Sequence, residues 1–393
     1  MTNRSVLISG ASVAGPALAY WLGRHGFEVT VVEIAPRLRA GGYAVDFRGP
    51  THLTVLERMG VLDELRAVRT GGSPMTFVDE HDRTLLHLPA EFAGGEVEVL
   101  RSDLSRILYE RSRDRAEYIF GDSIQAMTET ADGVHVTFES GTERMFDLVI
   151  GADGIHSGVR RLAFGPESEF VSFLGYYVAC WDMPNHFGVS SGSIAHNTLG
   201  RMASFGVDHR DSTKAGAMFV FASPELDYDR RDLDRQKQLI TEAYRGIGWR
   251  VPELLDSLGR ADELYFDSIS RSDVPSWSKG RIALVGDAAA GATLGGMGTG
   301  AAIVAAYVLA GELSTSDGEH RTAFRRYENA LRRFAEGCQK GGNRTGKFLA
   351  PRTGFGLTAR NRLLGTSPLM RLMLKAGKEV SDRVDLADYP VAG

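Results

Sequence analysis

Cysteine is scarce in this sequence. Cys180 and Cys338 are the only two among 393 residues, so the chain has no C-x-x-C pair and no cysteine cluster with metal-ligand spacing. This scarcity argues against a disulfide framework and a dithiol redox centre, and it favours a reducing compartment. We expect no metal site. Because the N-terminus enters a predicted strand at once, with no visible signal peptide, we expect a cytoplasmic protein.

Long apolar runs and an excess of positive charge are also missing. The longest apolar run, Ala301 to Ala310, falls well short of the ~20 residues that a membrane-spanning helix needs. Lys and Arg number 45 against 50 Asp and Glu, which gives a formal net charge of −5 at pH 7. Nucleic acids and anionic membranes attract basic surfaces, so we expect neither as a partner. We expect a small-molecule partner and a monomer or homodimer.

A dinucleotide-binding fingerprint lies at the start of the chain. The apolar run 6–8 has the length of a buried parallel strand, and a turn of small residues from Gly10 to Gly15 follows it. A helical pattern comes next, then a second apolar strand at 29–32, with Glu33 at its end. The order of strand, tight turn, helix, strand and acid is the context in which this fingerprint is expected.

Each position of the fingerprint has a physical task. Gly10 allows the sharp turn and Gly15 allows helix and strand to pack closely, while the helix N-terminus offers free N–H groups to a pyrophosphate. Glu33 can accept hydrogen bonds from a ribose diol. The middle glycine of the usual pattern is Ser12 here, so a side chain stands where the phosphate approaches. The residues expected to cradle the pyrophosphate are Gly10, Ser12, Val13, Ala14 and Gly15. A βαβ unit with a glycine turn and no ligand is the alternative.

Charged residues beyond the fingerprint are further candidates. Arg39, Asp46 and Arg48 follow in a loop with paired glycines, where they either meet a bound ligand or are solvated surface charges. Arg101 stands directly before a helical pattern and is placed to reach an anion or a carbonyl.

Two more buried strands end in turns that contain glycine and aspartate. The strand at 145–150 runs into Gly151-Ala152-Asp153-Gly154, and the strand at 281–285 runs into Gly286-Asp287-Ala288-Ala289. Ligands collect at the carboxyl ends of parallel strands. Asp153, Gly286 and Asp287 are therefore candidate ligand contacts.

The last part of the chain has helical patterns. Gly298 and Thr299 precede a long apolar helix at 301–313, and the first N–H groups of that helix suit a developing negative charge. A second helix is expected at 323–334. Residues 340–362 have the composition of a basic connector broken by glycines, and an amphipathic helix near 368–380 is expected to pack across domains.

Short alternating segments at 73–100 and aromatic-rich segments at 165–272 predict an antiparallel sheet with one buried face, interrupted by a helix at 231–245. We interpret this sheet as a second domain that covers the cofactor. The side chains that could line an apolar pocket are Tyr176, Trp181, His196, Arg201, Phe205 and Phe219, with Arg48 as a further substrate candidate. Ordinary sheet core explains most of them better.

Three motifs now stand in order: Gly10-x-Ser12-x-x-Gly15, Gly151-Ala152-Asp153-Gly154 and Gly286-Asp287-Ala288-Ala289. At this spacing the chain resembles the single-component FAD-dependent aromatic monooxygenases, the para-hydroxybenzoate hydroxylase group that includes the tetracycline-modifying flavoenzymes. The resemblance covers nearly the whole chain. Its final stretch, ending Asp388-Tyr389-Pro390, resembles the compact branch that lacks a C-terminal thioredoxin-like domain.

The resemblance implies an α/β fold, with a Rossmann-like FAD-binding domain, an inserted and mostly antiparallel β-sheet substrate domain, and a C-terminal helix. The FAD-binding domain is expected to be discontinuous, at residues 1–73, 97–165 and 274–340. The substrate-binding domain is expected at 74–96 and 166–273, and the C-terminal connector and interdomain helix at 341–393.

The implied activity is a monooxygenase that uses NAD(P)H and O2 to hydroxylate or otherwise oxygenate an aromatic or polyketide-like molecule through a flavin C4a-hydroperoxide. FAD is the implied cofactor. NAD(P)H is a transient co-substrate, because the chain has a single nucleotide fingerprint. The chemistry belongs to the flavin, so no side chain is assigned a catalytic role.

The resemblance also implies roles for single residues. It implies that the turn 10–15 holds the FAD pyrophosphate and that Glu33 holds the adenosine ribose. Arg39 is expected near the phosphates of FAD or NAD(P)H, and Asp46 is expected beside the flavin ring. It implies that Arg101 contacts FAD and that Asp153 takes part in binding both FAD and NAD(P)H. It also implies that Asp287 binds the ribityl or ribose part of the cofactor. The backbone of Met297, Gly298 and Thr299 is expected to face the flavin N1–O2 edge.

The sequence departs from the family after its third motif. The family usually continues with His and then Pro, where this chain has Ala290 and Thr293 or Leu294. A second hypothesis is therefore a flavin-fold enzyme that uses FAD structurally for a non-redox cyclisation. An NAD-dependent dehydrogenase is a third, although it leaves the second and third motifs unexplained. A binding or scaffold role ranks last.

Overall fold

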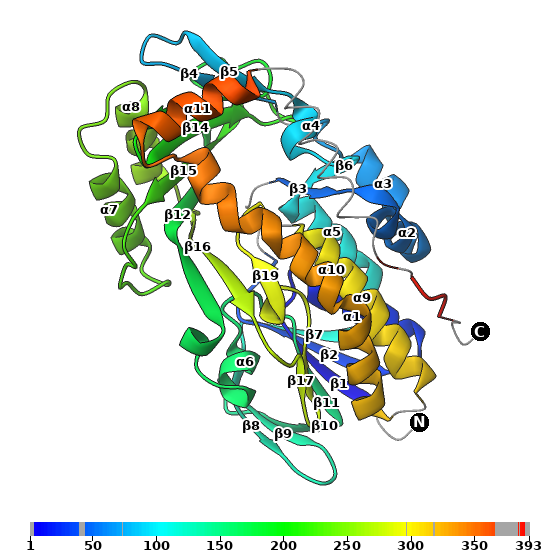
Figure 1. Cartoon of the computed structure of the whole chain (residues 1–393). Coiled ribbons are helices and arrows are strands. Elements are labelled where there is room, and N and C mark those ends of the chain that lie inside the picture. Colours follow the sequence, from blue (N-terminus) through cyan, green and yellow to red (C-terminus); the bar gives the residue numbers. More distant parts are fainter. Residues whose placement is uncertain are drawn as a thin grey trace.

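The computed structural model describes residues 4–38, 44–72, 74–295, 297–316, 319–365, 384 and 386–389. The apolar runs at the start of the chain form the centre of a six-stranded sheet in the order β17–β18–β11–β1–β2–β7 (Figure 1). All its neighbouring strands are parallel except β17 and β18. The strands are β1 (Ser5–Ser9), β2 (Glu28–Glu33), β7 (Ala116–Phe120), β11 (Leu148–Gly151), β17 (Ser278–Lys279) and β18 (Ile282–Leu284).

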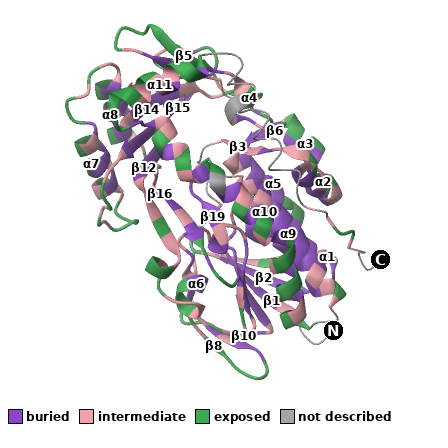
Figure 2. Ribbon diagram, in the orientation of Figure 1, coloured by how far each residue is buried: buried purple, intermediate pink, exposed green. Residues whose placement is uncertain are grey.

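Helices pack in layers on this sheet. Helix α1 (Ala14–Arg24) lies on β1 and β2 and also contacts α5 (Arg101–Ser112) and α9 (Gly298–Thr315). Helix α10 (His320–Leu349) covers the outer side of α9. Helix α9 is apolar almost all round, and such a helix needs neighbours on all sides. Figure 2 shows the result as a continuous buried centre of sheet, α1 and α9.

The aromatic-rich middle of the chain forms a second sheet of eight strands, in the order β19–β16–β12–β15–β14–β13–β4–β5. Only β13 and β4 pair in parallel. The strands are β4 (Met75–Val78), β5 (Thr84–Leu88), β12 (Val171–Pro184), β13 (Ser193–Thr198), β14 (Arg201–Val207), β15 (Lys214–Ala222), β16 (Tyr265–Asp273) and β19 (Ala290–Ala292). The predicted α/β fold with an inserted, mostly antiparallel sheet is confirmed. Strand β19 joins this sheet although it lies within the range predicted for the FAD-binding domain.

The two faces of the eight-stranded sheet pack against different helices. Successive residues of a strand point to opposite faces, so Tyr176 and Tyr177 separate. Tyr177 belongs to the cluster that includes α7 (Leu233–Ala243) and α8 (Val251–Arg260). Tyr176 belongs to the cluster that includes the end of α10 and α11 (Gly354–Leu364).

The predicted connector at 340–362 is helical instead. Helix α10 continues to Leu349, and α11 follows after a short break. Glycine disfavours a helix interior by only about 1 kcal/mol, and packing overrides that preference here. A Cβ on Gly341 would stand 2.5 Å from the carbonyl oxygen of Gly295, and one on Gly346 would stand 2.6 Å from the ring of Tyr176. The glycines therefore let α10 pass close to β12 of the eight-stranded sheet and to the loop that follows β19.

Smaller elements complete the described part of the chain. They are α2 (Gly49–Met59), α3 (Leu62–Ala67), α4 (Ala90–Ala93), α6 (Gly158–Ala163), the pair β3 (Ala44–Phe47) and β6 (Val97–Leu100), and the sheet of β8 (Ile124–Glu129), β9 (Val134–Phe138) and β10 (Glu143–Phe146). The helix predicted near 368–380 lies outside the described residues. None of the described helices combines the length and apolar character needed to span a membrane.

Candidate cofactor and substrate site

Three turns meet at one edge of the six-stranded sheet. Parallel pairing places Ser9, the last residue of β1, beside Gly151 at the end of β11. Gly151 in turn lies beside Leu284, the last residue of β18. The turns that follow these strands are therefore neighbours, at the carboxyl ends where ligands of such sheets bind.

The glycines of the first turn are required by close contacts. Gly10 has a φ of 105°, and a Cβ there would stand 2.6 Å from the carbonyl oxygen of Ala152 in the second turn. A Cβ on Gly15 would stand 1.9 Å from the carbonyl oxygen of Gly10. Only glycine fits either position, because backbone atoms cannot rotate away as side chains can. The first turn is thus pressed against both α1 and the second turn.

Glu33 is already bound to the backbone around the first turn. Its Oε2 accepts a hydrogen bond of 2.7 Å from the N–H of Ala11, and its Oε1 accepts one of 2.9 Å from the N–H of Ala35. These bonds fix a half-buried carboxylate beside the turn. Each oxygen keeps a lone pair with which it can accept a further hydrogen bond from a hydroxyl group.

Arg101 connects the first turn with the third. Its Nε and Nη2 donate to Oγ of Ser12 at 3.3 and 3.2 Å. Burial raises the pKa of Asp287, and the charge of Arg101 lowers it in part. The guanidinium therefore lies near both the N-terminus of α1 and the half-buried Asp287, where it can meet an anion.

Asp153 and Asp287 each present a buried oxygen that has no hydrogen-bond partner within the described part of the chain, Oδ1 in both cases. The other oxygen of Asp153 accepts from Ser9 Oγ at 3.4 Å and from the N–H of Val159 at 3.1 Å. Burial raises the pKa of both aspartates. Unsatisfied buried oxygens are unfavourable, and a ligand with hydroxyl donors would satisfy them.

Helix α9 begins beside the third turn. A Cβ on Gly298 would stand 3.0 Å from Asp287 Oδ1, and one on Gly286 would stand 3.2 Å from Ala302 and 3.4 Å from Ala14. The first turn of α9, which includes Thr299, therefore lies near the N-terminus of α1. Both helices have free N–H groups at this end.

Residues 3–337 match the model of a family described as FAD binding domain. The chain belongs to the FAD-binding domain family. It is 42% identical over 340 residues to an uncharacterised protein of Mycobacterium tuberculosis, covering 85% of this chain and 91% of the relative. It is 38% identical to a flavin-dependent monooxygenase of Legionella longbeachae, covering 86% and 88%. Its structure is similar to that of the tetracycline destructase Tet(51), with a TM-score of 0.87, 29% identity, and coverage of 98% and 100%.

These findings confirm the resemblance to the FAD-dependent monooxygenases and identify FAD as the cofactor. The two unsatisfied aspartate oxygens, the cation at Arg101 and the two free helix N-termini fit a ligand of that kind, which carries hydroxyl groups and a diphosphate. Among the described residues, no group of three or more His, Cys, Asp or Glu side chains is placed to hold a metal ion.

Two of the candidate residues from the loop after the fingerprint interact with each other or with nearby residues of the chain. Asp46 on β3 and Arg48 at the start of α2 form an ion pair with each other. The N–H of Arg48 donates to Nδ1 of His52 at 3.2 Å, and burial together with the charge of Arg48 lowers the pKa of His52 to about 4. The His52 ring lies against Gly300, whose Cβ would stand 2.3 Å from it. Arg39 lies outside the described residues.

Five of the pocket candidates share one face of the eight-stranded sheet. Trp181, Phe205 and Phe219 are buried in the cluster against α7 and α8, where the Trp181 indole donates to Ser257 and the Phe219 ring lies 4.0 Å from that of Tyr244. The other two are His196, which stacks on Trp249, and Arg201, whose Nε donates to the carbonyl of Ala243. Their contacts are those of sheet core and helix packing. Tyr176 alone lies on the opposite face.

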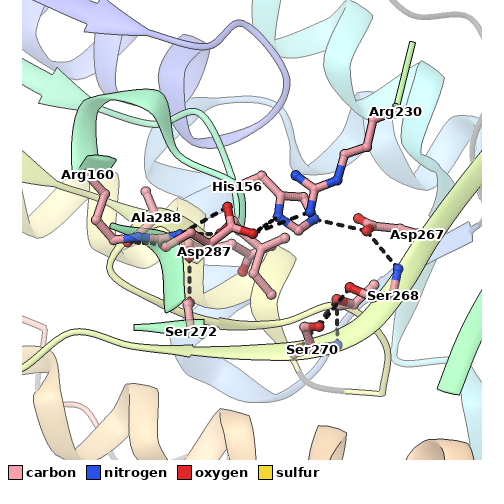
Figure 3. A network of polar contacts seen from close by, with 12 residues as sticks. His156, Arg160, Arg230, Asp267, Ser268, Ser270, Ser272, Asp287 and Ala288 are labelled. Carbon is pink, nitrogen blue, oxygen red and sulfur yellow. Dashed lines mark hydrogen bonds and ion pairs between the residues drawn. The ribbon is translucent and has the colours of Figure 1, made fainter. Parts of the chain in front are cut away.

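A polar cluster joins the two sheets of the FAD protein (Figure 3). His156, three residues after Asp153, shares hydrogen bonds with Glu167 at 3.0 Å and with Asp267 of β16 at 2.9 Å. Burial lowers the pKa of His156, but the bonds to the two carboxylates outweigh it and raise the pKa above 6.5. Arg230 donates to Glu167 from a loop of the second sheet. We call these four residues the His156 cluster.

Sequence reasoning gave no role to His156, Ser272 or Gln339, which the structure places around the second and third turns. His156 follows the second motif closely, and this proximity is a signal that could have singled it out. Ser272 and Gln339 are far from any motif in the sequence. Only the pairing of β16 with β19 and the course of α10 bring them to the site.

Proposed function

We propose that the protein is a flavin monooxygenase that uses NAD(P)H and O2 to oxygenate an aromatic or polyketide-like small molecule. The observation that carries this proposal is the direct continuation of the third turn into the second sheet. Strand β19 begins at Ala290, three residues after Asp287, and pairs with β16. A molecule bound on that sheet would lie next to the cofactor. Oxygenation of a tetracycline-like compound fits the activity named for the structural relative.

The residues around the three turns have separate tasks in this proposal. The turn from Gly10 to Gly15 and the N-terminus of α1 hold the pyrophosphate, while Glu33 accepts from the adenosine ribose. Arg101 meets the phosphates or the flavin. Asp153 and Asp287 accept from hydroxyl groups of FAD with their unpartnered oxygens.

The bound FAD supplies electron transfer and oxygen activation. The protein contributes orientation, exclusion of water and favourable electrostatics, and one feature of the site serves each of the last two. Ala288 and Ala289 of the third turn are buried apolar residues. The N–H groups of the first turn of α9 would favour negative charge on a bound flavin. NAD(P)H binds transiently, without a fingerprint of its own.

The substrate surface is the face of the second sheet that carries Tyr176. Tyr176 belongs to a hydrophobic cluster on this face, and three partly buried members of that cluster, Met75, Cys180 and Met218, are apolar and polarisable. Such side chains adapt to a large planar molecule. They replace Trp181, Phe205 and Phe219, which face α7 and α8, as our candidates for substrate contacts.

The test is a turnover experiment with purified protein. We expect a yellow protein with a flavin spectrum that oxidises NADH or NADPH and consumes O2 when a tetracycline or phenolic substrate is added. The product should gain one oxygen atom by mass spectrometry. A product isomeric with the substrate, formed without NAD(P)H oxidation, would support the cyclisation hypothesis instead. The variant Asp287→Asn serves as a negative control and Asp273→Asn, an exposed aspartate on β16, as the matched positive control.

A further inference from the structure

The segment from Asp287 to Gly291 runs from the third turn into β19, and we call it the Asp287 turn. One serine of the second sheet holds it at both ends. Ser272 on β16 is fully buried, and its Oγ donates a hydrogen bond of 2.6 Å to the carbonyl oxygen of Asp287. The same Oγ accepts a hydrogen bond of 2.8 Å from the N–H of Gly291. One hydroxyl group thus connects the first and last residues of this turn. Figure 3 shows Ser272 beside Asp287 and Ala288.

Two other buried side chains support the arrangement. Gln339 of α10 is 7% exposed, and its Nε2 donates to the carbonyl oxygen of Ser272 at 2.5 Å and to that of Gly291 at 3.5 Å. Arg160 of α6 is fully buried, and its Nη1 donates to the carbonyl oxygen of Ala288 at 3.0 Å. The turn is therefore fixed by side chains from three different elements, and Ser272 is the only one of the three that bonds to both of its ends.

The shape of the turn determines where the Asp287 carboxylate points. A Cβ on Gly291 would stand 2.2 Å from Asp287 Oδ1, so the carboxylate lies over Gly291 inside the turn. That Oδ1 is the buried oxygen without a partner in the described part of the chain. If Gly291 moved away from Asp287, the free oxygen would move as well.

We propose that Ser272 is a positioning residue for FAD, which holds the turn from Asp287 to Gly291 in the shape that presents the Asp287 carboxylate to the cofactor. Because Ser272 belongs to the sheet proposed to hold the substrate, it also couples the position of that sheet to the cofactor contact. The proposal rests on the proposed contact between Asp287 and FAD.

The test compares FAD affinity and stability in matched variants. Ser272→Ala removes both hydrogen bonds to the turn. Ser270→Ala is the control, because Ser270 is also buried on the same strand, while its Oγ pairs with Ser268 at 2.8 Å and with no residue of the turn among those that the structure describes. Gln339→Met removes the support of the Ser272 carbonyl. For each variant, the dissociation constant of FAD is measured by quenching of flavin fluorescence, and the melting temperature is measured without FAD.

We expect Ser272→Ala to weaken FAD binding about tenfold or more, because the Asp287 carboxylate is no longer held in the position in which it meets the cofactor. Gln339→Met should weaken it by a smaller factor, and Ser270→Ala should leave it within about twofold of the wild type. Ser272→Ala should also lower the melting temperature without FAD, because its two hydrogen bonds are lost in the free protein as well, so FAD affinity is measured at a temperature at which every variant is folded. If Ser272→Ala does not fold, Gln339→Met decides by the same comparison with Ser270→Ala.

Equal FAD affinities in Ser272→Ala and Ser270→Ala would overturn the positioning role. Asp287→Asn, measured in the same series, separates this failure from a failure of the contact on which it rests. If Asp287→Asn loses affinity while Ser272→Ala does not, the contact holds and the positioning role is wrong. If Asp287→Asn keeps wild-type affinity, the proposed contact is wrong, and the positioning role with it.

Discussion

Replacement of Asp287 by Asn should change stability and cofactor affinity in opposite directions. Asn has nearly the same shape but carries no charge. The pKa of Asp287 is raised above 3.8 by burial, so its ionised form destabilises the folded protein without FAD. For a carboxylate with a raised pKa, this penalty is fully present above the folded pKa and disappears as the pH falls below the unfolded pKa. At pH 7 the variant without FAD should therefore be at least as stable as the wild type.

Affinity for FAD should fall at the same time. A hydrogen bond to a charged acceptor contributes about 1.5–3 kcal/mol, which corresponds to a loss of roughly 10- to 150-fold in affinity. The free energy of unfolding is measured by urea titration of the protein without FAD at pH 7, and the affinity by flavin fluorescence. Asp273→Asn, at an exposed site, should change neither. A variant that is both less stable and unchanged in FAD affinity would refute the reasoning.

Three further predictions concern the surrounding residues. Glu33→Lys should weaken FAD binding at least tenfold, because a cation replaces the acceptor beside the first turn and an acceptor–hydroxyl bond is lost; unchanged titration curves would contradict the ribose contact. Gly300→Ala should lower the free energy of unfolding by about 1–3 kcal/mol, because the new methyl group meets the His52 ring. In the double variant, His52→Ala should recover part of that loss. Against burial and the opposing charge of Arg230, the pKa of His156 is raised by its bonds to Asp267 and Glu167, so these two bonds stabilise the fold below pH 6.5 and this contribution is lost as the pH rises through the folded pKa. His156→Gln should therefore flatten the decline of the urea stability profile as the pH rises above 6.5; an unaltered profile would exclude the histidine as its source.

The fold could be predicted from local patterns because its nucleotide-binding half is built from them. The strand, turn and helix of the fingerprint are consecutive in the sequence, and parallel strands place their carboxyl ends together wherever they occur. The three motifs were therefore sufficient to predict that Gly10, Asp153 and Asp287 belong to one site.

For the second sheet, local patterns predicted the strands but not which side chains face the cofactor. Alternation in a strand reveals that neighbouring residues point to opposite faces, but it does not say which face meets the cofactor. Trp181 and Phe219 are the right types for an aromatic pocket and belong instead to the core against α7 and α8. Helix α10 was cut short in the prediction because glycines are poor helix formers, whereas its packing against Gly295 and Tyr176 requires them.

The residues that support the third turn could not be predicted from the sequence, for a different reason. Ser272 and Gln339 are ordinary residues on a strand and a helix, and nothing in their neighbours distinguishes them. Their role arises from the antiparallel pairing of β16 with β19, which sets Gly291 opposite Ser272. Contacts between segments far apart in the sequence carry this information.

Oxygen transfer is tested most directly by turnover under labelled dioxygen. Purified protein, FAD, NAD(P)H and a tetracycline or phenolic substrate are incubated under 18O2, and the product is analysed by mass spectrometry. The account predicts a product that carries one labelled oxygen atom, formed together with oxidised NAD(P)+. A product without the label, or one that forms equally well without NAD(P)H, would contradict it.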